Sequence, residues 1–321
     1  MAQYTSPSST TPEPPSITLP DGRKLSYFTF GVTPTPTVPS PPTILYLHST
    51  PSSGLEASHL HPLALSLSLR IIAPNRPGLS TSTPHPTSTL PTTISDLSNL
   101  ISLISLLHLP PLALLAAHSG APFALGLATA LPQSHIRGLA VLSGTYPPSP
   151  ASGQRGTHWT PWLVKNLSYY APALVLSAFD AQLGRLARDT ERPELFQEAV
   201  LRHMASRPAS DLVAMRDGDI KAAVVEGARE GVRFGSGGAM REAMLLGMEW
   251  GFRVEDVRLV GRVWLCHGRE DGETSVAMAE GVKGRIEGAV LEVVEGEAGI
   301  GVVLKRREVA LGKLKAWLEE G

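Results

Sequence analysis

The chain has 321 residues, of which 42% are hydrophobic and 18% are charged. This length is typical of one large domain or of a core domain that carries an insertion. The 28 basic and 29 acidic residues give a formal charge of -1, which excludes the basic surface typical of a nucleic-acid-binding protein. The single cysteine, Cys266, excludes internal disulfides and cysteine-cluster metal sites.

The N-terminal segment is too polar to fold by itself. Residues 1–15 are rich in Ser, Thr and Pro, and this composition predicts a disordered tail. The segment lacks the apolar stretch of a signal peptide. No apolar run in the chain approaches the roughly 18 residues that a membrane span needs. We therefore expect a cytoplasmic protein without membrane attachment.

Short apolar runs alternate with helix-length segments along most of the chain. Two runs flank a Pro-Asp-Gly turn at residues 20–22 and predict a hairpin. Buried strands are predicted at residues 43–47, 70–73, 112–116, 138–143, 262–267 and 289–294. Helices are predicted near residues 56–67, 92–107, 121–131, 276–286 and 302–318. This alternation predicts a mostly parallel sheet covered by helices on both faces.

Residues 146–254 interrupt the alternation. They contain amphipathic helical patterns, for example at 192–204 and 217–230, and no convincing strand. We therefore predict a core formed by residues 16–145 and 255–321, with 146–254 as a helical lid. The lid should lie over the carboxyl ends of the strands, where open α/β sheets bind ligands.

Several short segments carry a family resemblance through their order. LYLHSTPSS (45–53) is similar to a strand followed by an H-G-x-P-G-S loop, and APNRPG (73–78) to an A-P-D-R-P-G turn. AAHSGAPFAL (116–125) stands at the place of a nucleophile elbow. The segments WGF (250–252) through DV (256–257) and WLCHGRED (264–271) resemble the return strand and an acid-bearing loop. Together they resemble the α/β-hydrolase superfamily, especially its small esterase, peptidase and epoxide-hydrolase-like members. The resemblance implies an eight-stranded, mostly parallel sheet with a helical cap, and cofactor-free hydrolysis of a small molecule.

The elbow can be aligned with the family's G-x-S-x-G turn in two ways. In one, Ser119 is the nucleophile and the turn into the helix is one residue shorter than usual. In the other, Ala116 and Gly120 are the small flanking residues, no gap is needed, and His118 takes the place of the nucleophile. The first alignment supplies the serine nucleophile that hydrolysis needs. The second keeps the family's backbone spacing without a gap.

Of the other two members of a catalytic triad, the sequence offers an acid but no histidine in the usual place. Asp271 has the family's spacing for the acid, although it could instead cap the helix that follows. None of the ten histidines follows Asp271, and Gly299 stands near the place of the usual base. We expect the Gly299 loop to lie within side-chain reach of Asp271. Wild-type activity on activated esters should then be weak, and Gly299→His should raise it.

The resemblance also suggests the surroundings of the reacting group. Backbone amides near Ser49 and Gly120 are the expected oxyanion hole, and His48 either caps that loop or takes part in the site. His59 and His61 are two residues apart on a helix, so they should face different sides and bind no metal. An aromatic group forms either the interior of the helical segment or a wall of the substrate pocket, with members Trp159, Trp162, Tyr169 and Tyr170.

Three interpretations of function follow. The first is hydrolysis of an ester, lactone, amide or similar bond in a small apolar metabolite, in specialised metabolism, with Ser119 as nucleophile. The second is a lyase, cyclase or isomerase on the same scaffold, in which His118 performs acid–base chemistry. The third is a binding protein that retains the fold without the reaction. None of them needs a metal or cofactor.

Overall fold

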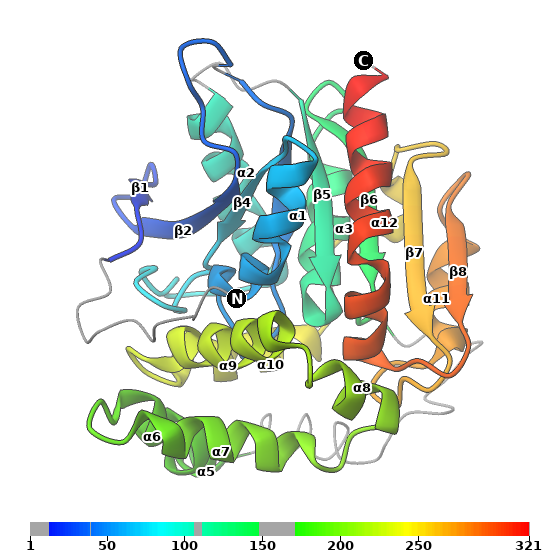
Figure 1. Ribbon diagram of the computed structural model, residues 1–321. Helices are drawn as coiled ribbons and strands as arrows, with labels where there is room; N and C mark the ends of the chain where they lie inside the picture. Colours follow the sequence, from blue (N-terminus) through cyan, green and yellow to red (C-terminus); the bar gives the residue numbers. More distant parts are fainter. Residues whose placement is uncertain (1–12, 39, 106–110, 148–170, 321) are drawn as a thin grey trace.

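The computed structural model describes residues 13–38, 40–105, 111–147 and 171–320, and its central feature is an eight-stranded sheet (Figure 1). The spatial order is β1-β2-β4-β3-β5-β6-β7-β8. β1 and β2 run antiparallel to their neighbours, and all the other pairs are parallel. The strands are β1 Ser16–Thr18, β2 Lys24–Gly31, β3 Thr43–Leu47, β4 Arg70–Pro74, β5 Leu112–Ala117, β6 Ile136–Leu142, β7 Val263–Gly268 and β8 Val290–Val294.

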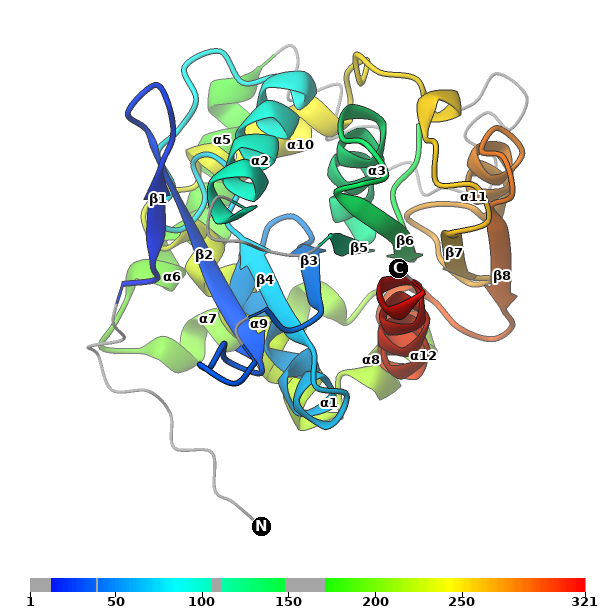
Figure 2. The ribbon, with the colours of Figure 1, turned by 90° about the horizontal axis from the view of Figure 1, so that it is seen from above.

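Helices cover both faces of the sheet, as Figure 2 shows from above. α2 (Leu90–Ser105), α3 (Ala121–Ala130) and α11 (Val276–Lys283) pack on one face. α1 (His61–Ser66), which follows the 3-10 turn η1 (Gly54–Leu60), and α12 (Gly299–Glu319) pack on the other. Every residue of β3, β5 and β7 is buried, because strands covered on both faces have no solvent-facing side. The predicted fold class is therefore confirmed.

The described part of the stretch between β6 and β7 is helical and contains no strand. Its helices lie beyond the carboxyl ends of the parallel strands (Figure 1), and we call them the inserted helices. They are α5 Pro172–Phe179, the π-helical turn η3 Asp180–Gly184, α6 Arg185–Arg188, α7 Pro193–Met204, α8 Ala209–Ala214, α9 Gly218–Val232 and α10 Gly237–Leu246; the 3-10 turn η4 (Val254–Asp256) then leads into β7. The lid boundaries at 146 and 254 stay a prediction.

Two cores hold the sheet between its helices, and a third lies among the inserted helices. In the first, Leu114 and Leu139 meet Phe123 of α3; in the second, Leu115 meets Leu314 of α12. The third core groups Phe196 and other inserted-helix residues around Leu79 of the core domain, so the inserted helices have a small interior of their own. No helix in the described ranges is both long and apolar enough to cross a membrane.

Candidate active site

The backbone decides which residue stands at the elbow between β5 and α3. His118 has φ +46°, whereas Ala117 before it is extended and Gly120 after it is helical. His118 O accepts a hydrogen bond from Thr145 N at 2.9 Å, which fixes the turn against the segment after β6. A left-handed residue other than glycine is uncommon and is often found at functional sites. The alignment without a gap is therefore the observed one, with His118 at the apex.

Ser119 follows the apex and still lines the cavity described below. It is 8% exposed, and its buried Oγ has no hydrogen-bond partner among the described residues. Gly120 packs against the end of β3, where a Cβ atom would collide with Leu47 O and lie 3.0 Å from His48 O. The glycine is thus required by packing, and its amide as an oxyanion donor stays a prediction.

Asp271 lies on the loop after β7 with its two carboxylate oxygens in different surroundings. Oδ1 accepts from the backbone amides of Glu273 at 2.9 Å and Thr274 at 3.2 Å. Oδ2 lies 3.8 Å from His267 Nε2, which is 2.7 Å from Thr274 O. Burial raises the pKa of Asp271, against the opposing charges of His267 and His118. One oxygen therefore stabilises the loop turn while the other faces the two histidines.

Gly299, at the start of α12, separates Asp271 from the elbow. A Cβ atom there would lie 2.7 Å from His118 Cε1, 3.2 Å from His118 Nδ1 and 3.5 Å from Asp271 Oδ2. The Gly299 loop is thus within side-chain reach of Asp271, as the sequence predicted. The His118 imidazole reaches from the elbow to the space that a side chain at 299 would fill. An imidazole is present beside the acid, but it comes from the nucleophile position.

The loop after β3, expected to supply an oxyanion amide, is held by a buried carboxylate. Glu56 accepts from Ser49 N at 3.1 Å and 3.2 Å, from Ser49 Oγ, and from Tyr46 Oη at 2.7 Å. A substrate oxygen could use the Ser49 amide only by displacing Glu56. His48 is fully buried; its Nδ1 lies 2.7 Å from Ser49 O, and burial holds its pKa well below the usual value. His48 does not line the cavity. Its position corresponds to the predicted alternative in which His48 caps the loop.

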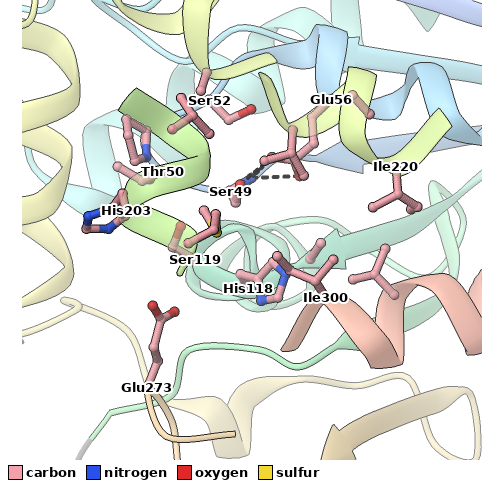
Figure 3. A pocket seen from close by; sticks show the side chains of 18 of the residues that line it. Ser49, Thr50, Ser52, Glu56, His118, Ser119, His203, Ile220, Glu273 and Ile300 are labelled. Carbon is pink, nitrogen blue, oxygen red and sulfur yellow. Dashed lines mark hydrogen bonds between the residues drawn. The ribbon is translucent and has the colours of Figure 1, made fainter. Parts of the chain in front are cut away.

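A cavity of about 300 Å³ lies between the elbow, η1, the start of α12 and the inserted helices. Figure 3 shows His118, Ser119 and Ser49 around it, with Ile220 and Ile300 among its apolar walls. Asp271 does not line the cavity, so His118 is the residue that contacts both the cavity and the space facing Asp271. The aromatic residues predicted as a pocket wall lie outside the described residues: Trp159, Trp162, Tyr169 and Tyr170.

Charged side chains from the inserted helices meet the acid loop at this cavity. Arg207 donates to Asp211 Oδ2 at 3.1 Å and to Glu273 Oε1 at 2.5 Å. Desolvation favours a higher pKa for Glu273, but the charge and hydrogen bond of Arg207, together with the charges of His118 and His203, hold that pKa below the usual value. In Figure 3 Glu273 and His203 approach the same side of the cavity as Ser119. Arg207 is thereby paired with two carboxylates of the chain.

Three residues of the site were not predicted from the sequence: Glu56, Glu273 and Arg207. They belong to no motif, and only tertiary contacts bring them to the cavity. His59 was considered solely as a metal ligand, yet it lines the cavity together with Glu56. Its spacing of three residues from Glu56 in a 3-10 turn places the two side chains on one face, which was the available signal. Among the described residues, no group of His, Cys, Asp and Glu is arranged to hold a metal ion.

Comparisons with known proteins identify the architecture. No family model matches the chain, and no curated protein is similar to it in sequence. Among solved structures, an esterase from Exiguobacterium antarcticum is 17% identical with a TM-score of 0.62, covering 95% of this chain and 99% of that one. A carboxylesterase structure from the Thaumarchaeon Nitrososphaera gargenis is 15% identical with a TM-score of 0.64, covering 96% and 100%. An N-acyl homoserine lactone degrading enzyme is 16% identical with a TM-score of 0.57, covering 94% and 99%. With the strand order, these likenesses show that the chain has the α/β-hydrolase fold.

Proposed function

We propose that the protein hydrolyses an ester or lactone of a small, largely apolar molecule, with His118 as general base. The observation that carries this proposal is the position of His118. Its left-handed backbone places an imidazole at the elbow apex, where it lines the cavity and lies next to Gly299 on the side of Asp271. An imidazole that lines the substrate space and lies on the side of a carboxylate is suited to general acid–base catalysis.

The reaction proceeds without a covalent intermediate in this proposal. A ring nitrogen of His118 takes a proton from water while the water oxygen adds to the substrate carbonyl carbon. The bond to the leaving oxygen then breaks, and the imidazolium returns its proton to that oxygen. Asp271 stabilises the transient positive charge on the imidazolium through space, and burial strengthens this interaction. The Ser119 hydroxyl, which has no described protein partner, hydrogen-bonds the attacking water or the carbonyl oxygen.

The cavity and the similar proteins support this substrate class. Apolar side chains from α7, α9 and α12 form much of the wall, including Val200, Met204, Ile220, Val224, Ile300 and Val303. A cavity of about 300 Å³ suits a small molecule. The similar solved structures include esterases and an enzyme that degrades a lactone.

A second candidate is proton transfer without hydrolysis, as in an isomerase, lyase or cyclase. One specific observation favours it: the Ser49 amide is occupied by Glu56. Without that donor, the site stabilises a tetrahedral oxyanion less well than a complete oxyanion hole, whose individual donors contribute about 10²–10³ in rate. Proton transfer to and from carbon by His118 is less dependent on that donor.

Three variants assayed on a panel of lactones and activated esters test the proposal. We expect His118→Gln to lower kcat/KM by about 10²–10⁴, and Asp271→Asn to lower it by a smaller factor. Ser119→Ala should lower kcat/KM by a smaller factor than His118→Gln does, and a fluorophosphonate should not label the protein, because no serine alkoxide forms. His135→Gln, at an exposed position, is the matched control. Labelling of Ser119 would contradict the mechanism, and an inactive wild-type protein across the panel would favour the second candidate or a binding protein.

A further inference from the structure

The end of the cavity next to η1 contains three buried polar side chains that the proposed reaction does not use. The Tyr46 hydroxyl lies 2.7 Å from Glu56 Oε1, and the rings of Tyr46 and His59 are 6.4 Å apart in an edge-to-face arrangement. All three residues line the cavity, and their exposures are 1% for Tyr46, 7% for Glu56 and 4% for His59. We call Tyr46, Glu56 and His59 the inner cluster.

Three hydrogen-bond donors near the inner cluster point at Glu56. Tyr46 Oη, Ser49 N and Ser49 Oγ donate to its carboxylate, which has about four lone-pair positions. In the described part of the chain, no basic nitrogen lies within 4 Å of this carboxylate. His59 Nδ1 is buried without a partner among the same residues. Buried polar groups are normally satisfied, so the inner cluster offers unused hydrogen-bonding capacity to a ligand.

The inner cluster suits a ligand group that both donates and accepts a hydrogen bond. The charge of Arg307 acts on His59, and the charge of Arg76 acts on Tyr46, so two guanidinium groups lie near the inner cluster. Neither pairs with Glu56, because Arg76 pairs with Glu242 and Arg307 lies 3.6 Å from Asp217 Oδ2. Burial, together with Arg307, keeps His59 neutral, with one nitrogen as donor and the other as acceptor.

We propose that the inner cluster binds a hydroxyl group of the ligand, at a distance from the carbonyl that reacts near His118. The hydroxyl donates to Glu56 and accepts a hydrogen bond from His59. In Figure 3 Ser49 and Glu56 lie on a different wall of the cavity from His118, so one elongated molecule can reach both. The substrate class is therefore a hydroxylated ester or lactone with an apolar connecting chain. This inference rests on the proposed function for the reacting group only.

Binding of unreactive ketones tests the inference separately from hydrolysis. Straight-chain methyl ketones of roughly six to ten carbons suit a cavity of this size, and each is compared with the same ketone bearing a terminal hydroxyl. Calorimetry on the wild-type protein should show that the hydroxyketone binds about tenfold more tightly at one or more chain lengths, as expected for a hydrogen bond to a charged group. A terminal amine in place of the hydroxyl should bind more weakly than the hydroxyl does.

Two variants locate the effect. Glu56→Gln and His59→Phe should each reduce the preference for the hydroxyl to about twofold or less, with urea unfolding used to verify that each variant folds. His203→Phe, which changes a histidine on another wall of the cavity (Figure 3), should keep the preference. The inference is overturned by equal binding of ketone and hydroxyketone at every length, by tighter binding of the amine, or by a preference that survives in both variants. A hydroxyl preference without any ester hydrolysis would support this site while contradicting the proposed reaction.

Discussion

At the scale of single residues, the elbow shows how a histidine can occupy a nucleophile position. Histidine is among the side chains that adopt left-handed backbone more readily than most, so His118 fits the turn at φ +46°. Its imidazole then fills the space beside Gly299, where a Cβ atom would already lie 2.7 Å from the ring. The two positions are therefore coupled, since a side chain at 299 requires a smaller one at 118.

This coupling changes the expected result of restoring the base. Gly299→His alone, proposed from the sequence, should not raise activity, because the new side chain meets His118. The double variant His118→Ser, Gly299→His should instead form a serine–histidine–Asp271 triad and increase hydrolysis of p-nitrophenyl acetate over the Gly299→His variant by at least about tenfold, since a serine gains an adjacent base. A fluorophosphonate should label residue 118 in the double variant only. Higher activity in the single variant would refute the coupling.

The buried histidine of the inner cluster should make stability depend on pH. Burial and Arg307 lower the pKa of His59 to about 3, whereas an unfolded histidine titrates near 6.5. Between these values the unfolded chain binds one more proton than the folded chain. The stabilisation is complete above about pH 6.5 and is lost progressively as the pH falls towards 3. At pH 5 this one group costs about 2 kcal/mol of stability.

Urea unfolding at pH 7.5 and pH 5 measures that loss. His59→Phe cannot take up the proton, so its stability should fall by about 2 kcal/mol less than that of the wild type between the two conditions. His135→Phe, at an exposed position, should behave like the wild type because solvent surrounds that imidazole in both states. An identical loss in the wild type and in His59→Phe would mean that His59 takes up its proton at the same pH in the folded and unfolded chains, which would contradict the prediction.

At the scale of elements, α8 holds the N-terminus of α12, the helix that begins at Gly299. Asp211 Oδ1 accepts from Ile300 N at 2.8 Å and Gly301 N at 3.0 Å, and Ser210 Oγ accepts from Ala298 N at 3.0 Å. A carboxylate at this end also interacts favourably with the helix dipole. An inserted helix thereby fixes the loop that, in a complete triad, would carry the base.

Removal of this cap should cost more than removal of an ordinary one. Asp211 is 1% exposed and also binds Arg207, so Asp211→Ala should lower the free energy of unfolding by about 3 kcal/mol. Asp217 caps α9 through the amides of Asp219 and Ile220 but is more exposed, and Asp217→Ala should cost about 1 kcal/mol. Urea denaturation compares the two variants, and equal losses would show that Asp211 is only a local cap.

At the scale of the whole molecule, one buried ion pair connects the inserted helices to the core. Arg76, after β4, pairs with Glu242 of α10 at 2.7 Å and 2.5 Å, and its guanidinium lies 4.4 Å from the centre of the Phe123 ring. Arg76 also donates to His48 O at 2.8 Å, and Glu242 accepts from the Thr50 hydroxyl. The loop beside the cavity is thus held by both parts of the molecule.

A double-mutant cycle tests this connection. Arg76→Met and Glu242→Gln should each destabilise the protein by about 3–5 kcal/mol, because each leaves a buried charged group or its contacts unsatisfied. The double variant should lose clearly less than the sum of the two, since no unpaired charge remains. Arg192→Met, which breaks an exposed pair with Asp189, should cost less than about 1 kcal/mol. Additive losses at Arg76 and Glu242 would mean that the pair does not couple the two parts.

The sequence by itself determined the architecture and the position of the acid loop. Continuous apolar runs such as those at 43–47 and 112–117 predict the strands of the sheet directly, because strands covered on both faces must be apolar throughout. The order of motifs placed Asp271 and Gly299 on neighbouring loops, because these loops follow β7 and β8, which pair side by side in the same direction. Only the tertiary structure decided between Ser119 and His118 at the apex, since that choice depends on a backbone angle enforced by packing. It also brought Glu56, Arg207 and Glu273 to the cavity, because contacts between distant elements follow from how helices pack and leave no local pattern in the chain.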